Sequence, residues 1–150
     1  RINILSMFKF SGIPEYAKDK TWEESWNVIG NQIYIFGKQQ HRMYRIMDKV
    51  DVLITDSPLL MSIHYDESKN EELKSLVLQQ NNSMNCLNFF LGRKFAYQSV
   101  GRSQTEEEAM NIDTSVLNIL DENGIDYVST HSSKEIAKKI ANLVGKLIKK

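Results

Sequence analysis

Three short apolar runs along the chain predict strands. They lie at residues 50–55, at about 84–91 (MNCLNFFL) and at 125–129 (IDYVS). The first run, VDVLIT, is apolar on both faces, which is typical of a strand in a parallel sheet. Helical patterns separate the three runs, and this alternation favours crossover connections. We therefore expect an α/β protein whose parallel sheet has few strands for its four or five helices.

A capping box predicts the start of one long helix. Thr21 can accept a hydrogen bond from a first-turn amide while Glu24 reaches back to the start of the helix. Apolar residues then recur at spacings of three and four, as on one face of a helix: Trp22, Trp26, Ile29, Ile33 and Phe36. The pattern predicts a single helix that continues to about Met47.

Three further helices are predicted downstream. One covers residues 67–80. Another opens at residues 103–106 (SQTE) and stops at Gly124, and the last opens at residues 132–135 (SSKE). The residues expected to face the core are Leu73, Leu76, Val77 and Gln80 in the first; Ala109, Ile112, Val116 and Leu120 in the second; and Ile136, Ile140, Leu143 and Leu147 in the third.

Composition narrows the class of protein. The 150 residues are 41% hydrophobic, which suffices for one domain with a core. Nineteen basic and nineteen acidic residues cancel, so no global field attracts nucleic acid or a membrane. The single Cys86 excludes an internal disulfide framework and fits a reducing cytoplasm. No apolar run approaches the roughly 20 residues of a membrane span, and no signal peptide is visible. The first residue, Arg1, suggests that the chain starts inside a longer protein.

Asp56 follows the strand at residues 50–55 and precedes Ser57 and Pro58. Ligand sites in open α/β sheets gather at the carboxyl ends of strands, so this acid is well placed to hold a cation. A turn with an Asx hydrogen bond explains the same residues. A Ser-His-Asp hydrolase site is not expected, because Ser57 has no histidine at a recognisable spacing.

Polar residues on the long helix form a second candidate site. Gln32, Gln39 and Arg42 project along one stripe. Amides can hydrogen-bond a base or a sugar, and arginine can bind phosphate. An ordinary solvated helix face gives the same pattern.

Two further segments carry candidate residues. Arg93 and Arg102 flank a loop that contains Gly101, and together they could neutralise a polyphosphate. Glu15, in the segment PEYAKD, could accept a proton from a substrate hydroxyl. A polar surface loop and a surface turn are the respective alternatives.

The segments PEYAKD, QIYIFGKQQHRMYR, VDVLITDSPLL and FFLGRKFAYQSVGRSQTEEEA occur in an order that resembles a known family. It is that of the P-loop kinase-like ATPases of phages and bacteria, related to the nicotinamide riboside kinase domain and more distantly to nucleoside and nucleotide kinases. The resemblance extends from about Ser6 to Val144. It implies a three-layer fold with a parallel sheet, together with ATP and magnesium as cofactors.

The resemblance also implies roles for individual residues. Asp56 matches the Walker B acid that holds magnesium, and Glu15 matches an acid near the phosphate acceptor. The other matched residues are those of the helix that lines the acceptor pocket, Gln32, Gln39 and Arg42, and the lid arginines that bind the donor phosphates, Arg93 and Arg102.

The sequence departs from the family in its first part. It contains no G-x-x-x-x-G-K followed by Ser or Thr, so the loop that cradles the phosphates is missing. ILSMFKFSG is interpreted as the end of the helix after that loop, with Gly12 as its stop, and Ile13 as the remnant of the family's second strand. The family's central first strand would then be absent. In an alternative interpretation, residues 2–8 form a strand.

The expected function follows from the resemblance. In its intact form the protein would transfer phosphate from ATP, with magnesium, to a nucleoside-like small molecule. A homo-oligomer is one expected form. This chain would then be a fragment with impaired ATP binding. The alternative is a non-catalytic nucleotide- or phosphate-binding module, or a degraded remnant. Neither alternative involves a membrane or nucleic acid.

Overall fold

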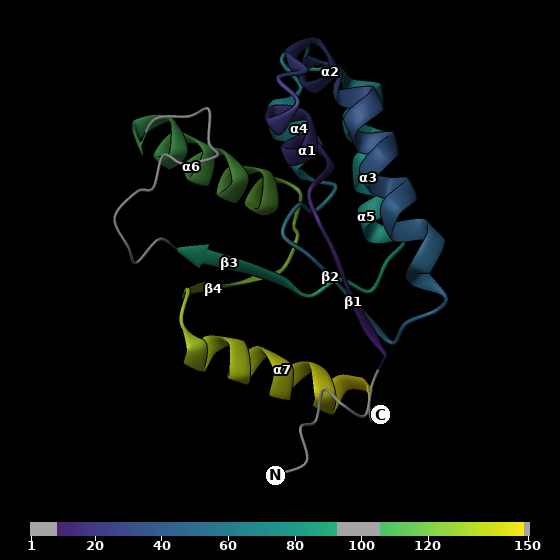
Figure 1. The fold of residues 1–150 in the computed structure, drawn as a ribbon. Coiled ribbons are helices and arrows are strands. Elements are labelled where there is room, and N and C mark those ends of the chain that lie inside the picture. The colour runs from purple at the N-terminus through teal and green to yellow at the C-terminus, as the bar shows by residue number, and fades with distance from the viewer. Residues whose placement is uncertain (1–8, 93–105, 149–150) are drawn as a thin grey trace.

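The computed structural model describes residues 9–92 and 106–148, which form a mixed α/β structure with two small parallel sheets (Figure 1). The elements are β1 (Phe10–Ile13), α1 (Tyr16–Trp22), α2 (Trp26–Gly30), α3 (Gln32–Met47), β2 (Val52–Thr55), α4 (Met61–Tyr65), α5 (Glu71–Asn82), β3 (Asn88–Gly92), α6 (Glu106–Glu122), β4 (Tyr127–His131) and α7 (Lys134–Ile148). No helix in these two ranges is long and apolar enough to cross a membrane.

The four strands pair in the order of the sequence. β1 runs parallel to β2, with Ile13 opposite Thr55, and β3 runs parallel to β4, with Asn88 opposite Tyr127. The three predicted strands exist, but the second begins only at Asn88 and the third is displaced by two residues to Tyr127–His131. The predicted parallel pairing is thus confirmed for β3 with β4. The expectation of one sheet is wrong for the described residues, because β2 pairs with β1 and not with β3.

The interpretation of ILSMFKFSG as a helix end is wrong for its last residues, because Phe10–Ile13 is a strand. The main chain of Lys9 and Asp51 starts the pairing: the Asp51 amide donates to the Lys9 carbonyl at 2.7 Å. Ile13 then points into the core while Phe10 stays exposed. This alternation has the period of a strand. Residues 2–8, helix or strand, lie outside the described residues.

The single long helix predicted from Thr21 is also wrong, because the chain forms α1, α2 and α3 there. Thr21 lies inside α1, where its hydroxyl donates to the Ala17 carbonyl at 3.1 Å instead of capping a helix. Glu24 adopts a left-handed conformation with φ of 53°, which ends the helical path. The side chain of Asn31 accepts a hydrogen bond from the amide of Tyr34 and starts α3 anew.

The remaining helices agree more closely with the prediction. α5 starts at Glu71, because the side chain of Asn70 accepts a hydrogen bond from the Leu73 amide at 2.9 Å. α6 is followed, as predicted, by Gly124 in a left-handed conformation with φ of 61°. Its predicted capping residues, Ser103 to Thr105, lie outside the described residues. At α7 the capping hydroxyl belongs to Ser133, which accepts from the Ile136 amide, and not to Ser132.

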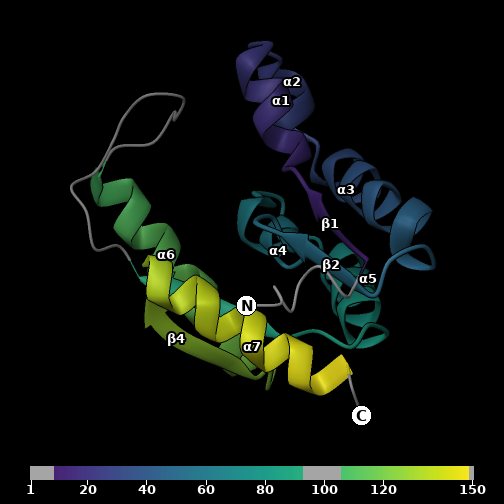
Figure 2. The ribbon, with the colours of Figure 1, turned by 60° about the horizontal axis from the view of Figure 1, so that its bottom comes forward.

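The core lies mainly between α3, α4, α5 and the β1–β2 pair. Its buried members are Ile13, Phe36, Met43, Leu59, Leu60, Leu73, Val77 and Leu120. Only Leu120 comes from the chain after residue 87. We call residues 9–82 the N-terminal part, and residues 88–92 with 106–148 the C-terminal part. In the C-terminal part, β3 and β4 lie between α6 and α7 (Figures 1 and 2).

Candidate functional site

Two of the predicted acids lie at the same end of the β1–β2 pair. Because β1 and β2 are parallel and Ile13 lies opposite Thr55, the residues that follow both strands meet at one edge of the sheet. Glu15 caps the start of α1 by position, yet its carboxylate makes no capping hydrogen bond. Its pKa is raised, first by burial and then by the negative charge of Asp56. The two carboxylates therefore form an acidic pair at the strand ends.

Gln39 joins the elements around this pair. Its side chain is buried, and its Oε1 accepts a hydrogen bond from the Tyr16 amide at 3.0 Å. Its Nε2 donates to Thr55 Oγ1 and to the Ser57 carbonyl, each at 3.3 Å. These bonds connect the start of α1 to the end of β2, so Gln39 positions the site. Both the oxygen and the nitrogen of its amide already have hydrogen-bond partners.

Gln32 has an unused acceptor. The residue is only 5% exposed, and its Nε2 donates to the Ile29 carbonyl at 2.8 Å. Its Oε1 is buried and has no hydrogen-bond partner. An unpaired buried acceptor costs about 1–3 kcal/mol, so such atoms are rare and call for an explanation. A ligand with an N–H or O–H group would supply the missing donor.

Gln32 and Gln39 therefore do not belong to a solvated helix face. They share the inward face of α3 with Ile35, Phe36 and Met43. The alternative of an ordinary solvated face is wrong for these two residues. The polar side chains of Gln32 and Gln39 suggested an exposed face. A glutamine can nevertheless be buried when its amide hydrogen-bonds to the neighbouring backbone.

A cavity of about 90 Å³ opens beside these residues. Its lining includes Glu15, Trp26, Ile29, Gln32, Gln39, Ser57, Met61 and Tyr65. The lining thus combines apolar and aromatic side chains with the Gln32 amide and the Glu15 carboxylate. Three of the predicted site residues, Glu15, Gln32 and Gln39, come together here.

Arg42 does not line this cavity. Its guanidinium donates to the Pro14 carbonyl at 3.2 Å and to Asp19 Oδ2 at 2.5 Å, and it lies over the ring of Tyr16 at 4.8 Å from the ring centre. These contacts hold residues 14–19 against α3. Arg42 therefore supports the loop that carries Glu15, and its predicted contact with substrate stays a prediction.

The acidic pair fits a magnesium ion of the kind that the resemblance implies. Magnesium is usually held by one or two carboxylates together with substrate phosphates and water. Asp56 is exposed, and its charge raises the pKa of Glu15, so a cation between them would relieve a repulsion. Within residues 9–92 and 106–148, no group of three or more His, Cys, Asp or Glu side chains could hold a metal without a ligand's help.

Some residues that line the cavity were not predicted from the sequence. Two predicted site residues lie in a segment that the structure does not describe. Trp26, Met61 and Tyr65 were missed as lining residues. Met61 and Tyr65 belong to α4, whose five residues are too few to give a helical periodicity. Arg93 and Arg102, the predicted lid residues, lie outside the described residues.

Comparisons with known proteins give no match: no family model, no curated protein and no solved structure matches this chain.

Proposed function

We propose that the cavity beside Gln32 binds a nucleoside-like small molecule, and that this molecule is the acceptor in a phosphate transfer that uses ATP and magnesium. The observation that carries the proposal is the buried Oε1 of Gln32, which has no partner and lies in a cavity at the carboxyl end of β2. The resemblance of the ordered sequence segments to P-loop kinase-like proteins supports the reaction.

The size of the cavity limits what enters it. A volume of about 90 Å³ is roughly that of three water molecules at about 30 Å³ each. This is room for the edge of a planar ring, and less than a whole nucleoside needs. The base would enter beside Trp26 and Ile29 and donate an N–H to Gln32, while its sugar would remain at the mouth near Glu15.

Glu15 has the chemistry of a proton acceptor for a sugar hydroxyl. Burial and Asp56 raise its pKa, and a carboxylate with a raised pKa is a stronger base. In its ionised form Glu15 would accept a hydrogen bond from the hydroxyl and orient it. Asp56 would hold the magnesium ion, which supplies positive charge to the phosphate oxygens during transfer.

A non-catalytic nucleoside- or phosphate-binding module is the second candidate. One observation favours it: the 150 residues contain no G-x-x-x-x-G-K followed by Ser or Thr. That loop supplies the amides and the lysine that hold the donor phosphates. A module of this kind would use the same cavity and lack the transfer step.

Calorimetric titration distinguishes the two candidates. We expect a set of nucleosides, including nicotinamide riboside, to contain at least one that binds. Release of ADP from magnesium-ATP in the presence of that nucleoside would support transfer. Nucleoside binding without ATP binding would support the module, and absence of nucleoside binding would overturn both.

The variant Gln32→Met tests the observation itself. It keeps the size of the side chain and removes the unpaired acceptor, so it should weaken nucleoside binding by about 1–3 kcal/mol, roughly 5- to 150-fold. Its free energy of unfolding should change little, because the loss of the Nε2 hydrogen bond to the Ile29 carbonyl offsets the removal of the unpaired Oε1. Gln79→Met, on the exposed side of α5, is the matched control and should change neither quantity.

A further inference from the structure

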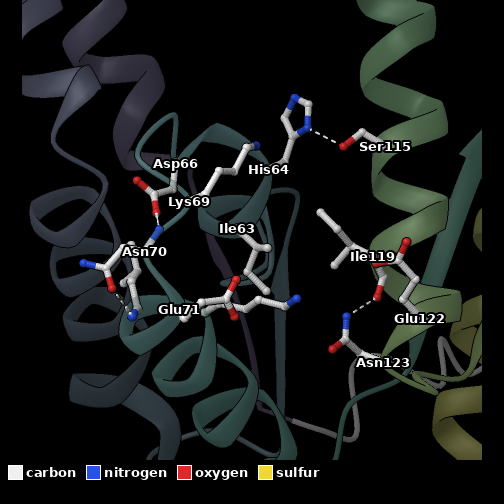
Figure 3. A pocket seen from close by; sticks show the side chains of 12 residues that line it. Ile63, His64, Asp66, Lys69, Asn70, Glu71, Ser115, Ile119, Glu122 and Asn123 are labelled. Carbon is white, nitrogen blue, oxygen red and sulfur yellow. Dashed lines mark hydrogen bonds between the residues drawn. The ribbon is translucent and has the colours of Figure 1, made fainter.

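A second cavity, of about 220 Å³, lies where α4, the loop of residues 66–70 and α5 meet α6 (Figure 3). It shares no lining residue with the cavity beside Gln32. Its lining combines charged side chains of both signs with a histidine and a serine. The question is which ligand these groups would recognise.

His64 and Ser115 form one end of this cavity. His64 Nδ1 and Ser115 Oγ are 2.7 Å apart and share a hydrogen bond. Burial, and then the charge of Lys69, lowers the pKa of His64, so the ring is neutral near pH 7. If Ser115 donates, the Nε2–H of the ring is free; if the ring donates, the Ser115 O–H is free. One neutral donor is therefore free in either tautomer.

Lys69 adds a positive charge to the same end. Figure 3 shows its amino group directed toward the His64 ring. The loop that carries it is fixed by Asp66, whose carboxylate accepts hydrogen bonds from Ser68 Oγ at 2.6 Å and from the Asn70 amide at 2.7 Å. Lys69 has a φ of 52°, a conformation that costs a non-glycine residue energy. The backbone that carries Lys69 is thus fixed by the loop, while its side chain is exposed.

The other end of the cavity is acidic. Glu71 and Glu122 lie away from His64 in Figure 3 and line the cavity together with Lys74. Glu71 and Glu122 place two negative charges at this end. Asn123 lines it as well, and its Nδ2 is occupied by the Ile119 carbonyl at 2.7 Å. This bond leaves the amide oxygen of Asn123 as a further acceptor.

We propose that this cavity binds a small zwitterion, an amino acid whose carboxylate meets Lys69 and the His64–Ser115 pair while its ammonium group meets Glu122 and Asn123. The ammonium group of such a ligand finds the negative charge of Glu122. Its carboxylate finds Lys69 and the neutral donor of the His64–Ser115 pair, next to Asp66, whose own carboxylate is occupied by the loop hydrogen bonds. The volume of about 220 Å³ is below the roughly 300 Å³ at which pockets for larger ligands begin. A short amino acid fits a cavity of this size.

The test is a titration of the complete chain, followed by the NMR signals of the His64 ring and by calorimetry. The probes are glycine, β-alanine, γ-aminobutyrate and 5-aminovalerate, with butyrate and butylamine as the two half-ligands. At least one amino acid should give saturable shifts of His64. It should bind roughly tenfold or more tightly than either half-ligand, as expected when a charge-assisted hydrogen bond is lost.

Two variants assign the two ends. Glu122→Gln keeps the side-chain length, and Lys69→Gln shortens the side chain by one atom. Each variant removes one charge and should weaken binding of the amino acid about tenfold or more. Lys138→Gln, on the exposed side of α7, is the control and should leave the affinity unchanged. Butyrate that binds as well as the best amino acid, unchanged affinity in Lys69→Gln, or no shift of His64 with any probe would each overturn the proposal.

Discussion

The N-terminal and C-terminal parts of the chain use similar elements but bury them to different degrees. Seven of the eight core residues come from the N-terminal part, and Leu120 alone comes from the C-terminal part. Leu143 and Leu147 of α7, predicted to face inward, remain 41% and 47% exposed. The comparison teaches that an amphipathic pattern predicts a helix well and its degree of burial poorly.

The two sheets show the same incompleteness. In the part of the chain that the structure describes, each sheet has two parallel strands, although parallel sheets are normally buried on both faces. Phe10 and Ile54 are exposed on one face of the β1–β2 pair, and Leu91 and Val128 on one face of the β3–β4 pair. The resemblance implies a central strand between the two pairs. Without that strand, one sheet would be divided into two pairs with exposed faces. Four parallel strands in two pairs do not identify a family, so this interpretation stays a prediction.

The largest effect is expected from truncating one leucine in each part. Leu73→Ala removes a side chain that is 5% exposed on α5, and it should lower the free energy of unfolding by about 2–5 kcal/mol. Leu143→Ala makes the same change on α7, where the side chain is 41% exposed, and should cost less than about 1 kcal/mol. Both sites are helical, so the difference in helix propensity cancels.

Urea unfolding curves of the two leucine variants measure this contrast. A loss of similar size in both would show that α7 is packed as tightly as α5. The division of the chain into a well-buried and a poorly buried part would then be wrong.

The sequence predicted the fold where the local pattern was strong. Val52, Leu53 and Ile54 form an unbroken apolar run within β2. Gly124 follows α6 in a left-handed conformation that glycine adopts at little cost. The prediction failed at residues 10–13, because pairing with β2 is a long-range contact that a local pattern does not contain. It failed again at Glu24, where an unusual backbone conformation ends a convincing apolar periodicity.

The site was predictable in part for related reasons. The position of Asp56 after a strand was enough to suggest an acid at the sheet edge, and the parallel register brings Glu15 beside it. The burial of Gln32 was not predictable, because it depends on how α2 and α4 surround the start of α3. The His64–Ser115 contact joins residues 51 positions apart, and no periodicity relates them.

The next largest effect concerns the two helix caps. Asn70→Ala removes the bond to the Leu73 amide and should lower the free energy of global unfolding by about 1 kcal/mol. Ser133→Ala removes the equivalent bond to the Ile136 amide, but α7 adds little to the core, so global unfolding should hardly change. Its effect should be local and appear as faster hydrogen exchange in the first turn of α7. Equal changes in global unfolding would contradict this difference.

A smaller effect is expected at the acidic pair in the N-terminal part. The raised pKa of Glu15 means that the folded state binds its proton more tightly than the unfolded state. Stability should therefore fall as the pH rises from 4.5, the ordinary value, through the folded pKa. Asp56→Asn should lower the pKa of Glu15, measured by NMR titration of its carboxyl carbon, and Glu15→Gln should remove this contribution to the pH profile. If the pKa of Glu15 is unchanged in Asp56→Asn, the charge of Asp56 does not act on Glu15, and the two residues are not an acidic pair.

The smallest effect is expected where the two parts meet, at the hydrogen bond between His64 of α4 and Ser115 of α6. Burial and Lys69 lower the pKa of His64, so the unfolded chain binds its proton more tightly than the folded one. The stability that His64 contributes is present above pH 6.5, the ordinary pKa of histidine, and is lost as the pH falls from there through the folded pKa.

His64→Gln should flatten this part of the pH profile. Ser115→Ala should retain the slope, because burial and Lys69 are unchanged, although it removes the hydrogen bond. A slope that disappears in Ser115→Ala would instead make the contact between the two parts the source of the pH dependence.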